Sequence, residues 1–398
     1  MPIPNVRLSR RSALALPILA AAAGPLAASS PAFAVGEGRP GTGAGQRATA
    51  MSIRGGDLSF TPQLEAAGIR FSDRGVVRPI ERILARRGAT MVRLRVWTAP
   101  PPGYSDADSA LAMARRVKRA GMKVLLNLHY SDFWADPGHQ DTPAAWQGQD
   151  LQTLAGTVYD YTRRLIARFA RHGAPVDMVQ IGNEVTAGML WPEGQIYRAD
   201  GSHFPEFCTL LKAGIAGARA GNPGHHRLDV MVHIDRGGDN GGTRWFFDHI
   251  AEQGVEFDVI GLSYYAMWHG PFAALSANLG DTVARYGKPV VVVETAYPWT
   301  LDNGDQLANF IYTSDQLPDA ATYPATPTGQ AAYFEALRDV LIAVPDGRGL
   351  GFIDWSPEWI PGVGWAPGEG NPNDNLTMCD WDGAALPSVA SFRPPRTR

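Results

Sequence analysis

Two glutamates that follow short apolar runs give the sequence its strongest indication of chemistry. Glu184 closes the segment MVQIGNE directly after Asn183, and Glu294 follows the run PVVVV. A carboxylate buried at the end of an apolar strand is costly unless it is paired. Each glutamate therefore either forms a structural ion pair, with Arg93 or Arg95 of MVRLRVW as candidate partners, or takes part in catalysis. Two such residues on separate strands favour catalysis.

Two carboxyl groups that face each other across a cleft are what retaining glycoside hydrolysis requires, and they are then expected about 5–5.5 Å apart. The nucleophile must stay ionised, so it needs hydrogen-bond donors and cations nearby. The acid must stay protonated, so it needs apolar surroundings or a neighbouring negative charge. Asn183 could donate to a sugar hydroxyl beside the reacting carbon. Because consecutive strand residues face opposite ways, Asn183 and Glu184 can share the cleft only if the strand end twists or bulges.

Eight short β-rich runs would position these residues. The predicted strands are Ser52–Ser59, Met91–Trp97, Lys123–Tyr130, Met178–Glu184, Leu228–Asp235, Phe257–Tyr265, Pro289–Thr295 and Leu350–Trp355. Segments with apolar residues three and four apart lie between them and predict helices. Examples are Val76–Gly88, Ala107–Gly121, Leu151–Gly173 and Thr328–Val344. Helix-ending glycines are expected at Gly88, Gly121, Gly173, Gly254 and Gly287.

Eight β-then-α units predict an α/β protein with a single-domain (β/α)₈ TIM barrel. An open, doubly wound sheet is the competing fold, but no Gly-rich phosphate loop follows the first strand, which also argues against a phosphate-handling barrel. Polar and aromatic residues gather at the predicted strand ends, where barrel active sites are built. They are Trp97, His129, Tyr130, Asn183, Glu184, His233, Asp235, Tyr264, Tyr265, Glu294 and Trp355.

The ends and the composition of the chain bear on where it works. Arginines precede the run ALALPILAAAAGPLAA and the segment SPAFA, so residues 1–34 are predicted to be a secretory signal peptide, with SRRSALAL suggesting the twin-arginine type. A membrane anchor is the alternative. Residues 35–50 are predicted to be a flexible Gly-rich linker and 51–398 the catalytic domain, giving a secreted or periplasmic product.

The formal charge of −3 offers no case for nucleic acid or membrane as partner. Cys208 and Cys379 allow at most one disulfide.

Several longer stretches resemble one family. IGNE and VVVVETAYPWT resemble the clan of (β/α)₈ retaining glycosidases with catalytic glutamates on strands four and seven. More narrowly, RGGDLSFTPQLEAAG, LLNLHYSDFWADPGHQ, VQIGNEVTAGMLWP, FDVIGLSYYAMWHG and WSPEWIPGVGW resemble glycoside hydrolase family 53, the arabinogalactan endo-β-1,4-galactanases. These pieces run in family order from about residue 54 to residue 390.

The resemblance implies Glu184 as acid/base and Glu294 as nucleophile, in agreement with the reading of the residues themselves. It also implies an arginine of the second strand near the nucleophile, for which we choose Arg95 because it lies nearer the strand end. A tyrosine of SYY should hydrogen-bond the nucleophile, either Tyr264 or Tyr265. The sugar groove should be lined by His129, Asp132, Trp134, His233 and Asp235, although each histidine could instead orient a carboxylate.

Stacking of sugar faces is expected from tryptophans near the strand ends, with core packing as the alternative for about half of them. The candidates are Trp97, Trp134, Trp268, Trp299, Trp355 and Trp359.

The expected substrate is (arabino)galactan, the protein is expected to be a monomer, and the chemistry requires no cofactor. Asp302, Asp305 and Asn309 offer oxygen ligands to a structural calcium ion, but their spacing fits the family's calcium loop poorly and favours a solvated acidic loop. A mannanase, xylanase or glucanase of the same clan is the nearer alternative, and a non-catalytic carbohydrate-binding barrel the more distant one.

Overall fold

The structure is a computed structural model that describes residues 50–101 and 103–395. The predicted signal peptide, residues 1–34, and nearly all of the predicted linker lie outside the described residues. Within the described part, Cys208 and Cys379 are buried and unpaired. That part also contains no helix with the length and apolar character needed to cross a membrane.

Eight parallel strands of the described chain close into a barrel in the order β1-β12-β11-β10-β9-β6-β5-β4. Their bounds are β1 (Ile53–Asp57), β4 (Met91–Val96), β5 (Lys123–Leu128), β6 (Met178–Ile181), β9 (Asp229–Ile234), β10 (Val259–Ser263), β11 (Val290–Thr295) and β12 (Gly349–Asp354). All eight predicted strands are confirmed, with ends that differ from the predicted ones by at most three residues. The predicted (β/α)₈ barrel is also confirmed.

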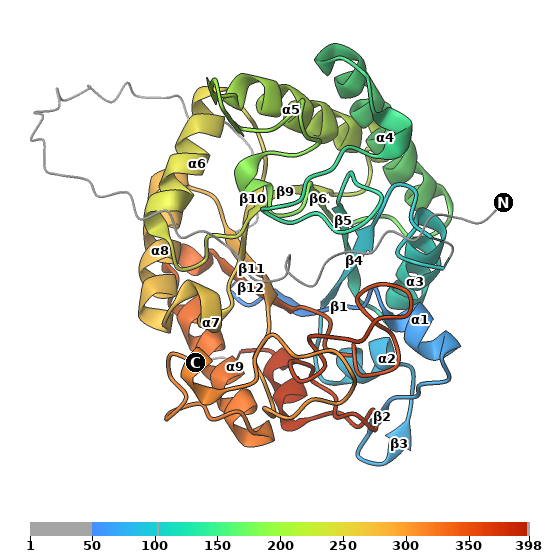
Figure 1. The fold of residues 1–398 in the computed structure, drawn as a ribbon, viewed down its shortest axis with the longest axis vertical. Helices are drawn as coiled ribbons and strands as arrows, with labels where there is room; N and C mark the ends of the chain where they lie inside the picture. The colour runs from blue at the N-terminus through green and yellow to red at the C-terminus, as the bar shows by residue number, and fades with distance from the viewer. Residues whose placement is uncertain (1–49, 102, 396–398) are drawn as a thin grey trace, which may run out of the picture. The chain divides into compact units, whose positions relative to one another are not determined.

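Helices surround the strands as a ring (Figure 1). They are α1 (Thr61–Ala66), α2 (Ile80–Arg86), α3 (Ala107–Arg119), α4 (Leu151–Arg171), α5 (Phe204–Gly221), α6 (Asn240–Glu252), α7 (Ala266–His269), α8 (Phe272–Tyr286) and α9 (Pro327–Ala343). The glycines expected to end helices all have positive φ, from 63° at Gly287 to 98° at Gly88. A left-handed residue of this kind closes a helix most easily when it is glycine.

Two parts of the helix prediction are wrong. The segment predicted as one helix from Val76 begins instead with β3 (Val76–Val77), which pairs with β2 (Ser72–Asp73), and the helix starts at Ile80, after Pro79. Proline lacks the N–H that a helix interior needs and restricts the residue before it, so the helix cannot extend back through Pro79. The eighth unit ends in the short 3₁₀-helix η5 (Pro387–Phe392) after a long loop, because the Pro- and Gly-rich sequence after β12 does not sustain an α-helix.

The remaining short elements decorate the loops. They are the hairpin β7 (Tyr197–Arg198) and β8 (Gly201–Ser202), with the 3₁₀-helices η1 (Ala144–Trp146), η2 (Val185–Ala187), η3 (Ser314–Gln316) and η4 (Pro345–Gly347). Long loops follow β11 and β12 at the carboxyl end of the barrel.

Side chains fill the barrel interior below that end. The apolar interior cluster consists of Ile53, Met91, Leu125, Met178, Met231, Val259, Val291, Val293 and Ile353. A packed interior leaves only the carboxyl ends of the strands and their loops to form a site, as in other barrels of this kind.

Candidate active site

The two predicted catalytic glutamates lie at the carboxyl end of the barrel. Glu294 is the second-to-last residue of β11, and Glu184 comes three residues after β6 ends. Among the neighbouring charges, the negative charge of Glu294 raises the pKa of Glu184 the most. Ser263 donates to Oε1 of Glu184 at 2.5 Å and is the register partner of Glu294 between β10 and β11, so the two glutamates belong to one site.

The backbone leaves β6 through a pair of left-handed residues. Gly182 has a φ of 76°, and Glu184 has φ 47° and ψ 52°. A β-carbon at Gly182 would lie 2.4 Å from Cγ1 of Val185, so glycine is required there by both conformation and space. The turn allows Asn183 and Glu184 to face the same site. The expected departure of the strand end from regular alternation is therefore confirmed.

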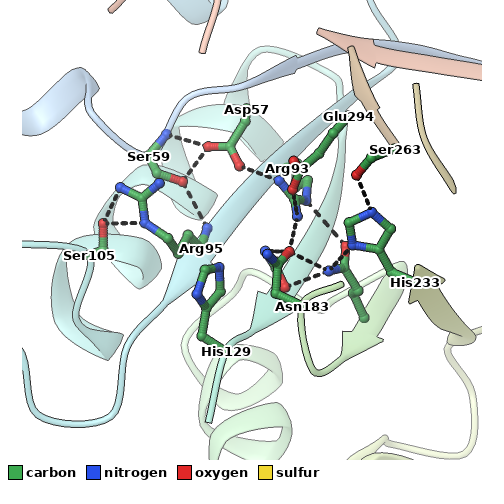
Figure 2. Close-up of polar contacts among 12 residues, drawn as sticks. Asp57, Ser59, Arg93, Arg95, Ser105, His129, Asn183, His233, Ser263 and Glu294 are labelled. Atoms are coloured by element: carbon green, nitrogen blue, oxygen red, sulfur yellow. Dashed lines mark hydrogen bonds and ion pairs between the residues drawn. The ribbon is translucent and has the colours of Figure 1, made fainter. Parts of the chain in front are cut away.

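Arg93 is the cation that contacts Glu294. Its Nη2 donates to Oε1 of Glu294 at 2.6 Å and to Oδ1 of Asn183 at 2.8 Å, and its Nη1 donates to Asp57 at 3.1 Å (Figure 2). Nε donates to Oε1 of Gln180 at 3.2 Å. The Arg93 side chain is 1% exposed, so this guanidinium is a desolvated link between two carboxylates and two amides.

The choice of Arg95 as the arginine beside Glu294 is wrong. Arg95 also projects from β4, but its guanidinium donates to Ser105 and lies 4.0 Å from the ring centroid of Trp134 and 4.6 Å from that of Trp97. Burial lowers the pKa of Arg95 to about 10. The side chain forms a cation–π cluster above Arg93 instead of pairing with the nucleophile candidate.

The structure distinguishes the two tyrosines of SYY. The hydroxyl of Tyr265 donates to Oε2 of Glu294 at 3.2 Å, whereas that of Tyr264 donates to the backbone oxygen of Gly270 at 2.7 Å. Glu294 thus receives a hydrogen bond on each oxygen, one from Arg93 and one from Tyr265. Both bonds favour its ionised form.

Asn183 is held by its neighbours on both sides of its amide. Its Oδ1 accepts from Arg93, from Asn127 at 3.1 Å and from Gln180 at 3.0 Å, and its Nδ2 donates to the backbone oxygen of Ala135 at 2.8 Å. The second hydrogen on Nδ2 has no partner within the described residues. It is the hydrogen available for a sugar hydroxyl, so the expected contact stays a prediction.

The surroundings of the two glutamates separate their proton affinities. Burial raises the pKa of Glu184 well above its usual value, and the negative charges of Glu294 and Asp235 raise it further. Burial also raises the pKa of Glu294, but the charge and hydrogen bond of Arg93 and the hydrogen bond of Tyr265 oppose that rise. A single proton in this site therefore resides on Glu184, which leaves Glu294 ionised.

The two predicted histidines are buried, and burial lowers the pKa of each well below its usual value. Nδ1 of His129 accepts from Nε1 of Trp97 at 3.3 Å and from the backbone N–H of Ala135 at 3.1 Å. His233 uses both ring nitrogens in contacts with Gln180, Ser263 and the backbone of Glu184. His233 thus orients protein groups.

The two predicted aspartates hold the loops around the site. Asp132 accepts backbone N–H groups of Ala99 at 3.0 Å and Ala144 at 2.8 Å. Asp235 accepts from the hydroxyl of Thr186, two residues after Glu184 in the chain. Their contact with sugar stays a prediction.

Comparison with known proteins decides the family. Residues 53–392 match glycosyl hydrolase family 53. The chain belongs to this family. An arabinogalactan endo-β-1,4-galactanase of Humicola insolens is 35% identical over 86% of this chain and 99% of its own, and one of Aspergillus niger is 34% identical over 78% and 86%. The solved catalytic domain of Ignisphaera aggregans GH53 superposes with a TM-score of 0.80 at 36% identity, over 86% of this chain and 96% of that one. The protein is a glycoside hydrolase built on a (β/α)₈ barrel.

Aromatic side chains of this family 53 enzyme form a continuous surface beside the glutamates. Trp268 is 56% exposed and lies 5.1 Å from Tyr265 and 6.1 Å from Phe310, between ring centroids. Phe310 lies 5.9 Å from Trp365, which stacks on Trp134 at 4.6 Å. Trp355 packs beside Trp134 at 5.9 Å. These rings form the aromatic row, which starts at Tyr265, the partner of Glu294.

Two of the predicted tryptophans are buried, and the ring of a third pairs with a tryptophan outside the aromatic row. Trp97 and Trp359 are 1% and 0% exposed, so they cannot stack on a sugar and the prediction for them is wrong. Trp359 stacks on Phe60 at 4.0 Å and packs in the core. Trp299 pairs with Trp381 at 5.3 Å and donates to Thr377, away from the aromatic row.

Sequence reasoning missed several residues of this family 53 site. Asp57 ends β1, Gln180 interrupts the apolar run of β6, Ser263 ends β10, and Trp365 lies in the loop after β12. A rule that collects every polar residue at a strand end would have found Asp57 and Ser263. Nothing in the sequence distinguishes Trp365 from a core tryptophan.

The loop that carries Asp302, Asp305 and Asn309, for which the sequence favours a solvated acidic loop over a calcium site, is organised by hydrogen bonds within itself and to the loop after β12. Asp305 accepts the backbone N–H groups of Leu307 at 2.8 Å and Asn371 at 2.6 Å, and Asn309 donates to Asp374 at 2.9 Å. Among the residues that the structure describes, no group of three or more His, Cys, Asp or Glu side chains is placed to bind a metal ion.

Proposed function

We propose that this family 53 enzyme is an arabinogalactan endo-β-1,4-galactanase that cleaves internal β-1,4-galactosidic bonds with retention of configuration. The names of relatives at 34–35% identity support the substrate. The observation that carries the mechanism is the unequal pair of glutamates. Glu294 is held by Arg93 and Tyr265, whereas no cation of the described residues contacts Glu184.

In the first step Glu294 acts as the nucleophile. Its ionised carboxylate attacks the anomeric carbon and forms a galactosyl ester, while Glu184 donates its proton to the departing glycosidic oxygen. Arg93 and Tyr265 keep Glu294 ionised and fix its direction before attack. Asn183, held by four neighbours, presents its remaining amide hydrogen to the hydroxyl beside the reacting carbon.

In the second step Glu184, now ionised, takes a proton from water. The resulting attack on the anomeric carbon breaks the ester, releases the galactan fragment with its original anomeric configuration and frees Glu294. Loss of the proton from Glu184 becomes favourable because the negative charge of Glu294 is neutralised in the ester. The two carboxyl groups and water complete the reaction, so it requires no cofactor. We expect the carboxyl separation typical of retention, about 5–5.5 Å.

The aromatic row accounts for action within a long chain. A β-1,4-galactan chain curves because its linkage is axial, and it presents apolar sugar faces that bury well on indole rings. Trp268 and Trp365 could each cover a sugar on the way from the glutamates to the loops after β11 and β12. Trp134 lies between Trp365 and the guanidinium of Arg95, so it supports Trp365 and has no free ring face for a sugar. Binding of several sugars at once would favour cleavage inside the chain.

The test is product analysis on linear galactan beside mannan, xylan and β-glucan. We expect galactan alone to be cut, into short oligosaccharides. NMR during the reaction should show that the anomer formed first at the new reducing end is β. Glu294→Gln should have no measurable turnover, and Glu184→Gln should lose about 10²–10⁴-fold in activity. Glu256→Gln, an exposed site, is the matched control and should retain activity. Cleavage of a different polymer, release of galactose alone, or an active Glu294→Gln would each contradict the proposal.

We further propose that residues 1–34 direct export and are removed, so that the enzyme works as a secreted or periplasmic monomer. The arginines followed by an apolar run and a small-residue site support this. N-terminal sequencing of enzyme recovered outside the cytoplasm should begin near Val35, and size-exclusion chromatography should give the mass of one chain. An intact leader on the exported protein would contradict the cleavage.

A further inference from the structure

His233 has a hydrogen-bonding pattern that fixes where its proton lies. Its Nδ1 is 3.3 Å from the backbone N of Glu184 and 2.9 Å from Nε2 of Gln180. A backbone N–H can only donate. The Gln180 amide is oriented by Arg93, which donates to its Oε1 and so leaves the NH₂ group facing His233. The two hydrogens of this NH₂ group are shared among His233 and three oxygens within 3.0 Å, so the backbone N–H of Glu184 is the donor that decides the matter. Nδ1 therefore accepts a hydrogen bond and carries no proton.

The proton of the neutral imidazole must then be on Nε2. This nitrogen lies 2.8 Å from Oγ of Ser263, which is fully buried at the end of β10 (Figure 2). Since Nε2 donates to Oγ, the single hydrogen of the serine hydroxyl is left for its other neighbour. That neighbour is Oε1 of Glu184, at 2.5 Å. The hydrogen bonds run in one direction, from the backbone N–H of Glu184 through His233 and Ser263 to the carboxyl group of Glu184.

We propose that Ser263 and His233 are a positioning pair that confines the acid proton of Glu184 to Oε2. Oε1 always accepts a hydrogen bond from Ser263, so a proton placed on Oε1 would face the serine hydrogen. Only Oε2 can then deliver a proton to the leaving sugar and later receive one from water. The inference rests on the proposed role of Glu184 as the acid/base.

The positioning pair has a second consequence for the reaction. A hydroxyl that donates to a carboxylate stabilises its ionised form, and the hydrogen bond from Ser263 opposes the rise in the pKa of Glu184 caused by burial. Glu184 must be protonated in the first step and ionised in the second. The serine keeps the second state accessible in a site where burial and neighbouring carboxylates disfavour it.

The test is the pH dependence of kcat/KM for Ser263→Ala. Without its hydroxyl the pKa of Glu184 rises, so the alkaline limb, where the acid loses its proton, should move up by about one pH unit. The acidic limb, set by Glu294, should stay in place. The loss of rate should fall on kcat, with KM near the wild-type value, because the serine touches Glu184 and not the substrate.

Two further variants separate the hydroxyl from the space it fills. Ser263→Thr keeps the hydroxyl and should restore the wild-type alkaline limb, whereas Ser263→Cys keeps the size but donates weakly and should behave as Ser263→Ala does. Ser388→Ala is the matched control, because that buried serine donates to Gln330 at 2.6 Å, far along the chain on η5, and should leave the pH profile unchanged.

The outcomes distinguish the inference from the function on which it rests. An unshifted alkaline limb in Ser263→Ala and Ser263→Cys, with Glu184→Gln impaired as expected, would overturn the positioning pair alone. Wild-type enzyme that does not cleave galactan, or a fully active Glu184→Gln variant, would overturn the proposed function itself.

Discussion

Replacing Arg93 with lysine removes the guanidinium that joins Glu294 to Asp57 but keeps one positive charge. Arginine reaches four partners here, these two carboxylates together with Gln180 and Asn183, because its donors form a rigid planar fork. A lysine ammonium is a single point on a flexible stem and cannot reproduce that geometry. The variant must therefore lose the 2.6 Å hydrogen bond to Glu294 or the bond to Asp57.

The expected magnitude follows from the charge on both partners. A hydrogen bond to a charged group contributes about 1.5–3 kcal/mol, and each 1.36 kcal/mol is tenfold in rate. We therefore expect kcat/KM to fall roughly 10- to 150-fold. The charge and hydrogen bond of Arg93 lower the pKa of Glu294. Weakening them raises this pKa, and since the nucleophile must be ionised, the acidic limb should move to higher pH.

The assay is kcat/KM on soluble galactan across the pH range, with Arg95→Lys as the matched control. Arg95 lies two residues along the same strand and is equally buried, but it makes no hydrogen bond to Glu294. Its variant should keep the acidic limb of the wild-type enzyme. An unmoved acidic limb in Arg93→Lys, or an equal shift in Arg95→Lys, would refute the reasoning.

The remaining predictions concern one hydroxyl and one buried acid. Tyr265→Phe should lower kcat about tenfold, because Glu294 loses a hydrogen bond. Tyr264→Phe is the control and should keep a kcat near that of the wild-type enzyme. Equal losses of kcat in the two variants in steady-state assays would contradict this prediction. Burial raises the pKa of Glu358 from 4.5 to about 8. Between these two values the unfolded chain loses the proton first, so the free energy of unfolding should fall by about 1.4 kcal/mol per pH unit as pH rises. Chemical denaturation at several pH values should show a flatter slope for Glu358→Gln but not for Glu256→Gln, and an unchanged slope in the first variant would show that Glu358 is not the group responsible.

The barrel could be predicted because its signals are local. Each strand is a short apolar run, and the glycines that end the helices need the left-handed conformation wherever they occur. The segment from Val76 was mispredicted because its spacing of apolar residues suits a helix. Pro79 and the pairing of Val77 with Ser72 decide the structure instead, and strand pairing is not a local property.

The site was predictable as a set of residue types, but not contact by contact. Arg93 and Arg95 share one face of β4, and the sequence favoured the one nearer the strand end. Strands of a barrel are tilted and staggered, so position along one strand does not give height relative to another. The register between β1 and β4 decides which arginine reaches Glu294, since Arg93 is the register partner of Asp57 and lies at the level of Glu294.

Burial of individual tryptophans was also beyond the sequence. Trp97 and Trp134 are close in space, with ring centroids 5.0 Å apart, yet only Trp134 is partly accessible. Their exposure depends on loops after β12 that carry Trp365. Those loops have no periodic pattern from which their path could be derived.

The most direct test of the paired glutamates is to trap the covalent intermediate. A β-1,4-galactobiosyl fluoride with fluorine at C2 of the reacting sugar should form an ester that hydrolyses slowly, because fluorine disfavours both transition states. Mass spectrometry of the digested protein should then find one galactobiosyl group on the peptide that contains Glu294. A label on Glu184, or no label while the natural substrate is cleaved with inversion, would contradict the assignment of the two glutamates.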